Sequence, residues 1–316
     1  DPYQVSAIYA LGSADNQGFG SVNLPINGVT GYEIGNRLAN PNLMPERRSE
    51  FEIGLEASFF KNFLSIDFTY YNAKVQDQIL SLPLAPSSVY TRQTANIGTI
   101  SNKGIEALVT FNWFRNTEEG AFNWTTSVNY TDQESILEEL DPRLEQVDLG
   151  GLSTTSFIAR EGQPIGLLMG SVALRDPNGN IVVDPNGVPI ASPIREVYGD
   201  TQYDYTMGIS NTFRYKGVQL DFTFDIRQGG LMYSRTAEIT RFTGNSVTTT
   251  FNDRQPFVVP GSVQRVLQDD GSFTYVQNTT PVDTEHMDDY YRADALSREN
   301  VIDKSFVKLR EVVLSY

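Results

Sequence analysis

An enzymatic or metal site in this chain would have to rely on carboxylates, because the other common catalytic side chains are nearly absent. The 316 residues include no Cys and a single His, His286. A Ser-His-Asp triad would need that histidine, which lies in the polar sequence His-Met-Asp-Asp-Tyr-Tyr. We interpret His286 as a solvated loop residue and predict neither thiol nor histidine-based metal chemistry.

Paired carboxylates could act as the acid and base of a glycosidase. Acidic pairs occur at Glu138-Glu139, Asp269-Asp270 and Asp288-Asp289. The chain has 39 acidic and 24 basic residues and a formal net charge of -15, so such pairs are expected on its surface. We therefore predict a protein that is not an enzyme and has no cofactor. The same charge argues against nucleic acid as a partner, whose phosphates attract Lys and Arg.

The segment Asp176-Pro177-Asn178-Gly179-Asn180 has alternating oxygen ligands, as a calcium loop does. It lacks glycine at the sixth loop position, and Gly187 occupies the position where a calcium loop has glutamate. A second Asp-Pro-Asn-Gly sequence covers 184–187. We predict two turns that bracket a small hairpin around 181–183, and no metal site.

Alternation of apolar and polar residues predicts the β-strands that would position any functional side chains. In 51–59 the odd positions are apolar, and in 64–70 the even positions are apolar. A hairpin about Lys61-Asn62 as a two-residue loop places Phe59 opposite Leu64, Leu55 opposite Phe68 and Ile53 opposite Tyr70. One register therefore pairs apolar with apolar along both strands. Each strand has roughly ten residues, the length of a tilted membrane-spanning strand.

Two further hairpins repeat this design. Their strands cover 105–113 and 122–130, linked by 115–121, and 205–213 and 218–227, with a turn at Tyr215-Lys216-Gly217. A last strand, 305–316, changes phase near Arg310-Glu311, where a β-bulge is expected. These segments make about seven strands, whose outer edges would be open, so we expect a fragment of a larger barrel.

The connections favour a membrane barrel over a soluble protein. Those within hairpins are short, whereas 73–102, 131–202 and 228–304 are long, polar and irregular in pattern. Soluble domains rarely contain structureless loops beyond about 15 residues, but outer-membrane barrels combine short periplasmic turns with long outer loops. Aromatic residues flank the short links and recur at the far strand ends, as in membrane girdles. The alternative is a secreted soluble β-sandwich that binds carbohydrate, whose strands also alternate.

Four segments, 40–46, 95–106, 209–217 and 305–316, resemble the C-terminal half of SusC/RagA-type TonB-linked outer-membrane transporters. The resemblance implies a plugged barrel of about 22 strands, driven by TonB and covered by a SusD-like surface lipoprotein. It implies import of a nutrient, glycan or oligopeptide. We expect 1–316 to be the C-terminal part of the barrel domain, without plug and final strands, and extracellular loops near 1–48, 73–102, 132–202 and 229–304.

The predicted fold class is all-β, part of a large transmembrane antiparallel β-barrel in the outer membrane. The apolar strand face is expected to contact the lipid bilayer, through Ile53, Leu55, Ile66, Phe68, Ile209, Leu220 and Phe222. The polar face is expected to line a wet lumen, through Glu52, Glu56, Asp67, Asp221 and Asp225. Six loop tyrosines could stack on cargo, contact the lipoprotein or pack within the loops: Tyr90, Tyr198, Tyr233, Tyr275, Tyr290 and Tyr291. We expect 131–202 and 228–304 to form an outer vestibule together.

Overall fold

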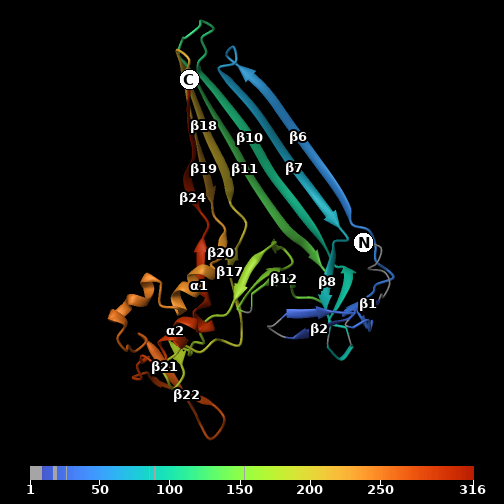
Figure 1. The fold of residues 1–316 in the computed structure, drawn as a ribbon, viewed down its shortest axis with the longest axis vertical. Helices are drawn as coiled ribbons and strands as arrows, with labels where there is room; N and C mark the ends of the chain where they lie inside the picture. Colours follow the sequence, from blue (N-terminus) through green and yellow to red (C-terminus); the bar gives the residue numbers. More distant parts are fainter. Residues whose placement is uncertain (1–8, 17–19, 26, 85, 89, 153) are drawn as a thin grey trace.

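The structure, a computed structural model, describes residues 9–16, 20–25, 27–84, 86–88, 90–152 and 154–316. A long antiparallel sheet occupies one end of the molecule and the connecting segments occupy the other (Figure 1). Seven strands follow one another in chain order across this sheet, which confirms the predicted barrel portion. They are β6 (Arg47–Phe59), β7 (Leu64–Gln76), β10 (Gly98–Phe114), β11 (Asn123–Leu140), β18 (Tyr205–Tyr215), β19 (Val218–Gln228) and β24 (Phe306–Ser315).

The first hairpin has the predicted register. Phe59 pairs with Leu64, and the pairing continues without a shift along both strands. The Phe63 N–H donates to the Phe60 carbonyl at 3.3 Å, which closes the turn about Lys61 and Asn62, while the paired strands end one residue earlier on each side, at Phe59 and Leu64. Phe60, Lys61 and Asn62 all have positive φ, so the chain reverses over four residues. In the third hairpin only Lys216 and Gly217 lie between paired residues, both with positive φ, as a two-residue hairpin turn requires.

The last strand contains the predicted bulge. Leu309 pairs with Phe224 and Glu311 with Thr223, so Arg310 has no partner across the ladder. The extra residue at the bulge brings the apolar residues after it back to the same face of the sheet as those before it. The apolar side chains before and after the bulge therefore share one face of the sheet: Val307, Leu309, Val312 and Leu314.

Several strands extend beyond the boundaries predicted from the sequence, and β6 already begins at Arg47, inside the expected loop 1–48. β7 continues to Gln76, β10 begins at Gly98 and β11 continues to Leu140, so the expected loop limits at 102 and 132 lie inside strands. In these extensions the alternation of the preceding strand is lost or changes phase, as in β7, where Ala73 and Val75 at odd positions follow apolar residues at even ones. Ion pairs connect them instead, Lys74 to Glu138 at 2.6 Å and Lys103 to Glu134 at 2.8 Å.

The segment 131–202 is ordered, and the expectation of an irregular region was wrong. It forms a four-stranded sheet, and its strands of two to five residues are too short to show alternation in the sequence. These strands are β12 (Val147–Gly151), β13 (Thr155–Ala159), β15 (Leu167–Gly170) and β17 (Glu196–Asp200), while β14 (Gln163–Pro164) pairs with β11 and β16 (Ile181–Val183) follows the first Asp-Pro-Asn-Gly turn.

The segment 228–304 contains the helices of the chain's C-terminal half. Its elements are β20 (Leu231–Tyr233), α1 (Arg235–Phe242), η3 (Val247–Arg254), β21 (Ser262–Leu267), β22 (Phe273–Gln277), α2 (Met287–Arg292), η4 (Asp294–Asn300) and β23 (Val301–Asp303). Helix α1 begins where the Ser234 hydroxyl accepts the Ala237 N–H. Earlier in the chain lie β1 (Tyr9–Leu11), β2 (Ser13–Asn16), β3 (Gly20–Asn23), β4 (Tyr32–Ile34), β5 (Arg37–Leu38), β8 (Ile79–Pro83), η2 (Pro86–Ser88) and β9 (Arg92–Asn96).

Most fully buried apolar residues lie in the connecting segments or at the strand ends beside them. One cluster surrounds Leu137 and Ile97, and a second surrounds Val183 and Val282. The apolar face of β6 is open: Phe51, Ile53 and Leu55 are 60%, 58% and 61% exposed. A β-sandwich would bury this face against a second sheet, whereas here these side chains remain exposed. Within the described ranges no helix has both the length and the apolar character needed to cross a membrane.

Candidate functional site

The seven-stranded sheet has one apolar and one polar face over most of its length. One register row crosses all seven strands with apolar residues only: Ala57, Ile66, Val109, Val128, Ile209, Phe224 and Leu309. All seven residues predicted to contact lipid lie on this face. The five acidic residues predicted to line the lumen lie on the opposite one.

A row of hydroxyl side chains crosses the polar face of six strands. Its members are Ser58, Ser65, Thr110, Ser127, Ser210 and Thr223. They pair across the strands, with oxygen–oxygen distances of 3.0 Å for Ser58–Ser65, 3.1 Å for Thr110–Ser127 and 3.0 Å for Ser210–Thr223. Such a row offers donors and acceptors to water or to a polar solute.

Carboxylates gather on this polar face toward the long connections. A hollow of about 470 Å³ is lined by Glu50, Glu52 and Glu106, with Arg48 and Tyr71 beside them. Near the other edge of the sheet, basic side chains accompany the carboxylate. There Asp225 lies 3.5 Å from the Arg227 Nε and 3.0 Å from the Arg310 Nη2.

Aromatic rings form a continuous chain beside the short turns. The ring centroids lie 5.6 Å apart for Phe63–Trp113, 5.4 Å for Trp113–Trp124, 5.3 Å for Trp124–Phe213 and 5.8 Å for Phe213–Phe222. At the other end Tyr130 stacks on Tyr205 at 5.5 Å. Aromatic belts at both ends of an apolar band are typical of the two interfaces of a membrane barrel.

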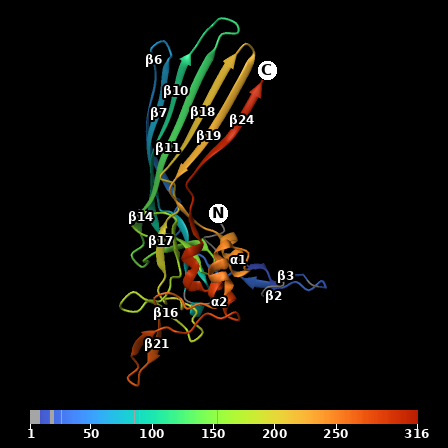
Figure 2. The same cartoon turned by 90° about the vertical axis from the view of Figure 1, so that its left-hand side faces the viewer.

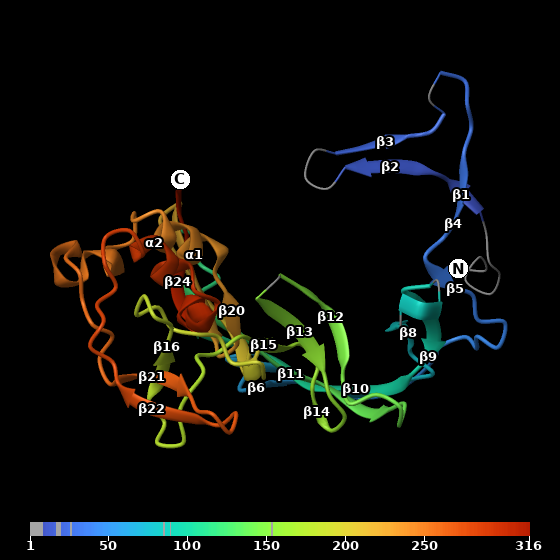
Figure 3. The ribbon, with the colours of Figure 1, turned by 90° about the horizontal axis from the view of Figure 1, so that it is seen from below.

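The segments 131–202 and 228–304 fold into one body, which we call the outer unit. Strand β16 of the first pairs in parallel with β21 of the second, and Figure 3 shows them side by side. Val183 of the first segment packs with Phe257, Val259 and Val282 of the second. The predicted turns at 176–179 and 184–187 flank β16, with hydrogen bonds of 2.9 Å and 3.0 Å that close them.

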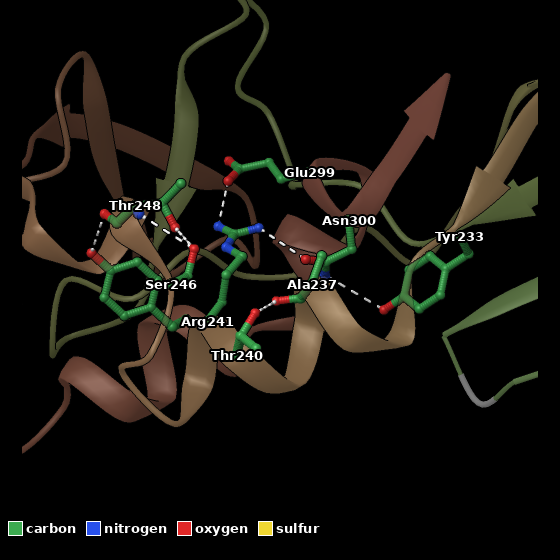
Figure 4. Close-up of polar contacts among 9 residues, drawn as sticks. Tyr233, Ala237, Thr240, Arg241, Ser246, Thr248, Glu299 and Asn300 are labelled. Atoms are coloured by element: carbon green, nitrogen blue, oxygen red, sulfur yellow. Dashed lines mark hydrogen bonds and ion pairs between the residues drawn. The ribbon is translucent and has the colours of Figure 1, made fainter. Parts of the chain in front are cut away.

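Arg241 of α1 organises the helical part of the outer unit. Its side chain is buried, donates to the Asn300 Oδ1 at 3.2 Å and forms an ion pair with Glu299 (Figure 4). Asn300 in turn donates to the Tyr233 hydroxyl at 3.5 Å. The guanidinium therefore connects α1 to η4. The sequence offered no periodic signal for this contact, because the partners lie 58 and 59 residues away.

The six candidate tyrosines occupy different environments. Tyr198 and Tyr291 are buried, and Tyr198 donates its hydroxyl to the Ser171 carbonyl. Burial raises the pKa of both Tyr198 and Tyr290 to about 12. Tyr233 donates to Glu238 at 2.8 Å, whereas Tyr275 is exposed on β22. Tyr90 is half-buried beside η2, far along the chain from the others. The structure brings Tyr290 and Tyr291 together, with centroids 5.1 Å apart.

The other candidate groups have local partners. Asp176 accepts the N–H groups of Asn178 and Asn180 and the Asn180 amide, which lowers the pKa of its carboxyl. These bonds close the predicted turn. His286 lies 2.8 Å from Asp283, which raises the pKa of the imidazole. Over the described part of the chain, no group of three or more His, Cys, Asp or Glu side chains could hold a metal ion.

Comparison with known proteins identifies this architecture. A family model described as TonB dependent receptor-like, beta-barrel, matches residues 4–160. The first half of the chain is therefore similar to the β-barrel of TonB-dependent receptors. Two receptors of Formosa agariphila are similar to it: TonB-dependent receptor P3, 29% identical over 67% of this chain, and TonB-dependent receptor P26, 27% identical over 74%. The matched regions make up 23% and 24% of those relatives, so the chain spans less than a quarter of their length.

Solved structures extend the likeness of the barrel to nearly the whole chain. The RagAB peptide transporter superposes with a TM-score of 0.63 at 18% identity, over 99% of this chain and 32% of that one. The RagAB peptide importer in its closed-closed state gives a TM-score of 0.61 at 19% identity, also over 99% of this chain and 32% of that one. The predicted resemblance to SusC/RagA-type barrels is therefore confirmed.

Proposed function

We propose that this chain forms part of the barrel wall and the outer unit of an importer in the outer membrane. The cargo of this importer is a nutrient, either a glycan or an oligopeptide. The observation that carries the proposal is the division of the seven-stranded sheet into an exposed apolar face and a polar face. In lipid every backbone polar group needs a partner, so strands cross only as part of a closed barrel. Lipid then contacts the face with Ile53 and Leu55, and cargo passes the hydroxyl row.

The proposal includes two partners, TonB as the source of energy and a SusD-like lipoprotein as a lid. Support for a lid comes from the hairpin β21–β22, which projects from the outer unit (Figure 2). Leu267 is 65% exposed and Phe273 45% exposed on this hairpin. Exposed apolar and aromatic side chains on a projecting element are typical of a contact surface for another protein.

Deletion of 269–275 in the full-length protein tests this function. It shortens the hairpin but leaves β16–β21 pairing and the sheet in place. We expect the lid to co-purify less and energy-dependent uptake to fall, while the heat-modifiable gel mobility that reports barrel assembly stays the same. A matched control removes 116–119 from the link between β10 and β11, and should affect neither readout. Unchanged uptake and lid binding after the hairpin deletion would contradict the role of the hairpin.

A further inference from the structure

The two segments of the outer unit enclose a cavity of about 250 Å³, which we call the inter-loop pocket. One wall comes from Arg175, Ile181 and Glu196 of the first segment, and the other from Leu296, Arg298 and Glu299 in η4. Sites for a whole small ligand usually measure roughly 300–1,000 Å³. The inter-loop pocket therefore suits one residue or one sugar unit of a longer cargo.

The pocket has two guanidinium groups that lack a carboxylate partner among the described residues. The Arg175 Nη1 donates to the Gly179 carbonyl at 2.6 Å, which positions the side chain without neutralising it. The Arg298 guanidinium lies over the ring of Tyr198, 5.7 Å from its centroid. Of the two carboxylates in the wall, Glu299 is already paired with buried Arg241, so only Glu196 remains to offset the two guanidinium groups and the lining keeps a net positive charge. The arrangement favours a ligand that contributes a negative charge.

The rest of the pocket lining is largely aliphatic. Leu296 is 7% exposed, and Ile181 packs beside the core cluster of Val183. Sugar hydroxyl groups placed against these aliphatic side chains would lose their hydrogen bonds to water without gaining hydrogen-bond partners in the pocket. An aliphatic side chain would instead bury apolar surface there.

We propose that the inter-loop pocket binds the carboxyl-terminal residue of an oligopeptide cargo. The α-carboxylate lies between Arg175 and Arg298, and an aliphatic side chain rests on Ile181 and Leu296. This inference rests on the proposed import function and narrows its cargo to peptides with a free carboxyl end.

Calorimetric titration of the purified full-length protein in detergent tests the pocket with a defined probe, acetyl-Ala-Ala-Leu. We expect the free acid to bind roughly tenfold or more tightly than its carboxyl-terminal amide, a difference of about 1.4 kcal/mol or more. A trimer of galacturonic acid carries carboxylates on hydroxylated rings and should bind more weakly than the free-acid peptide. Equal binding of acid and amide, tighter binding of the galacturonate, or no binding of the acid would each overturn the proposal.

Substitutions locate the binding. Arg298→Ala and Arg175→Ala should each weaken the free acid at least tenfold, whereas Arg298→Lys should retain part of the affinity by keeping the charge. Arg292→Ala is the matched control, because Arg292 is exposed and pairs with Asp288 at 2.8 Å outside the pocket. Wild-type affinity in both alanine variants would place the binding elsewhere. Energy-dependent uptake by the unmodified protein is measured separately, so that failure of the pocket and failure of import are distinguishable.

Discussion

The Arg310 Nη2 lies 3.0 Å from the Asp225 Oδ2, although Arg310 has no partner in the strand ladder. Lys308 stands directly opposite Asp225, and the Arg227 Nε approaches it at 3.5 Å. The bulge thus directs a third cation toward one carboxylate on the polar face. Because Arg310 is more than half exposed, this ion pair itself adds little stability. We infer that the main effect of the bulge is the correction of the strand's phase.

Deletion of Arg310 should therefore be tolerated. Without it, Leu309 and Glu311 keep their present partners, and Val312 and Leu314 remain on the apolar face. We expect the full-length variant to assemble at near wild-type yield, measured by heat-modifiable gel mobility. Deletion of Leu309 is the matched control. It would move Arg310 opposite Phe224 on the apolar face, at a cost of roughly 2–4 kcal/mol near the bilayer midplane. Similar yields of the two variants would show that the face assignment of β24 is wrong.

The two faces of β18 predict unequal costs for neighbouring substitutions. Ile209→Arg places a charge in the all-apolar row, where it should destabilise the barrel by roughly 2–4 kcal/mol. Ser210→Arg removes one hydroxyl contact to Thr223 on the polar face and should cost much less. Urea unfolding of the two variants in lipid vesicles gives the comparison. If both lose the same stability, the apolar face does not contact lipid.

The positions of the turns predict the orientation of the barrel. The short links lie at one end of the sheet and the outer unit lies at the other (Figure 1). We expect a cysteine in place of Asn186 to react with an impermeant reagent on intact cells, and one in place of Asn62 to react only after lysis. The native chain segment contains no Cys, so it adds no background of its own. Labelling of position 62 alone would reverse the orientation.

The outer unit should loosen at high pH. Burial raises the pKa of Tyr290 to about 12, above the value near 10 of an exposed tyrosine. A raised folded pKa means that the stability is fully present below pH 10 and is lost as the pH rises toward 12. We expect subtilisin to cut 228–304 faster above pH 10, and Tyr290→Phe to reduce this pH dependence. Tyr275→Phe, at an exposed ring, should leave it unchanged. An identical pH response in all three proteins would contradict this account.

The alternation of apolar and polar residues predicted the sheet, because each strand has one face in an apolar environment and the other in a polar one. The pairing register, the assignment of the two faces and the bulge at Arg310 all follow from this alternation, because residues of like polarity pair across neighbouring strands. The outer unit was not predictable in this way. Val183 and Val282 share a core, yet neither lies in a segment long enough to repeat a pattern. No pattern around Arg241 marks it as buried, and only the fold shows its contacts with Glu299 and Asn300 of η4.

The parallel pairing of β16 with β21 also bears on the order of assembly. The connection between these partners includes the complete β18–β19 hairpin, so the pair cannot form until that hairpin and the chain beyond it are available. Hairpins of the sheet need only neighbouring residues and can close early, whereas contacts between distant segments form slowly. We therefore expect the outer unit to be the part of this chain that matures last.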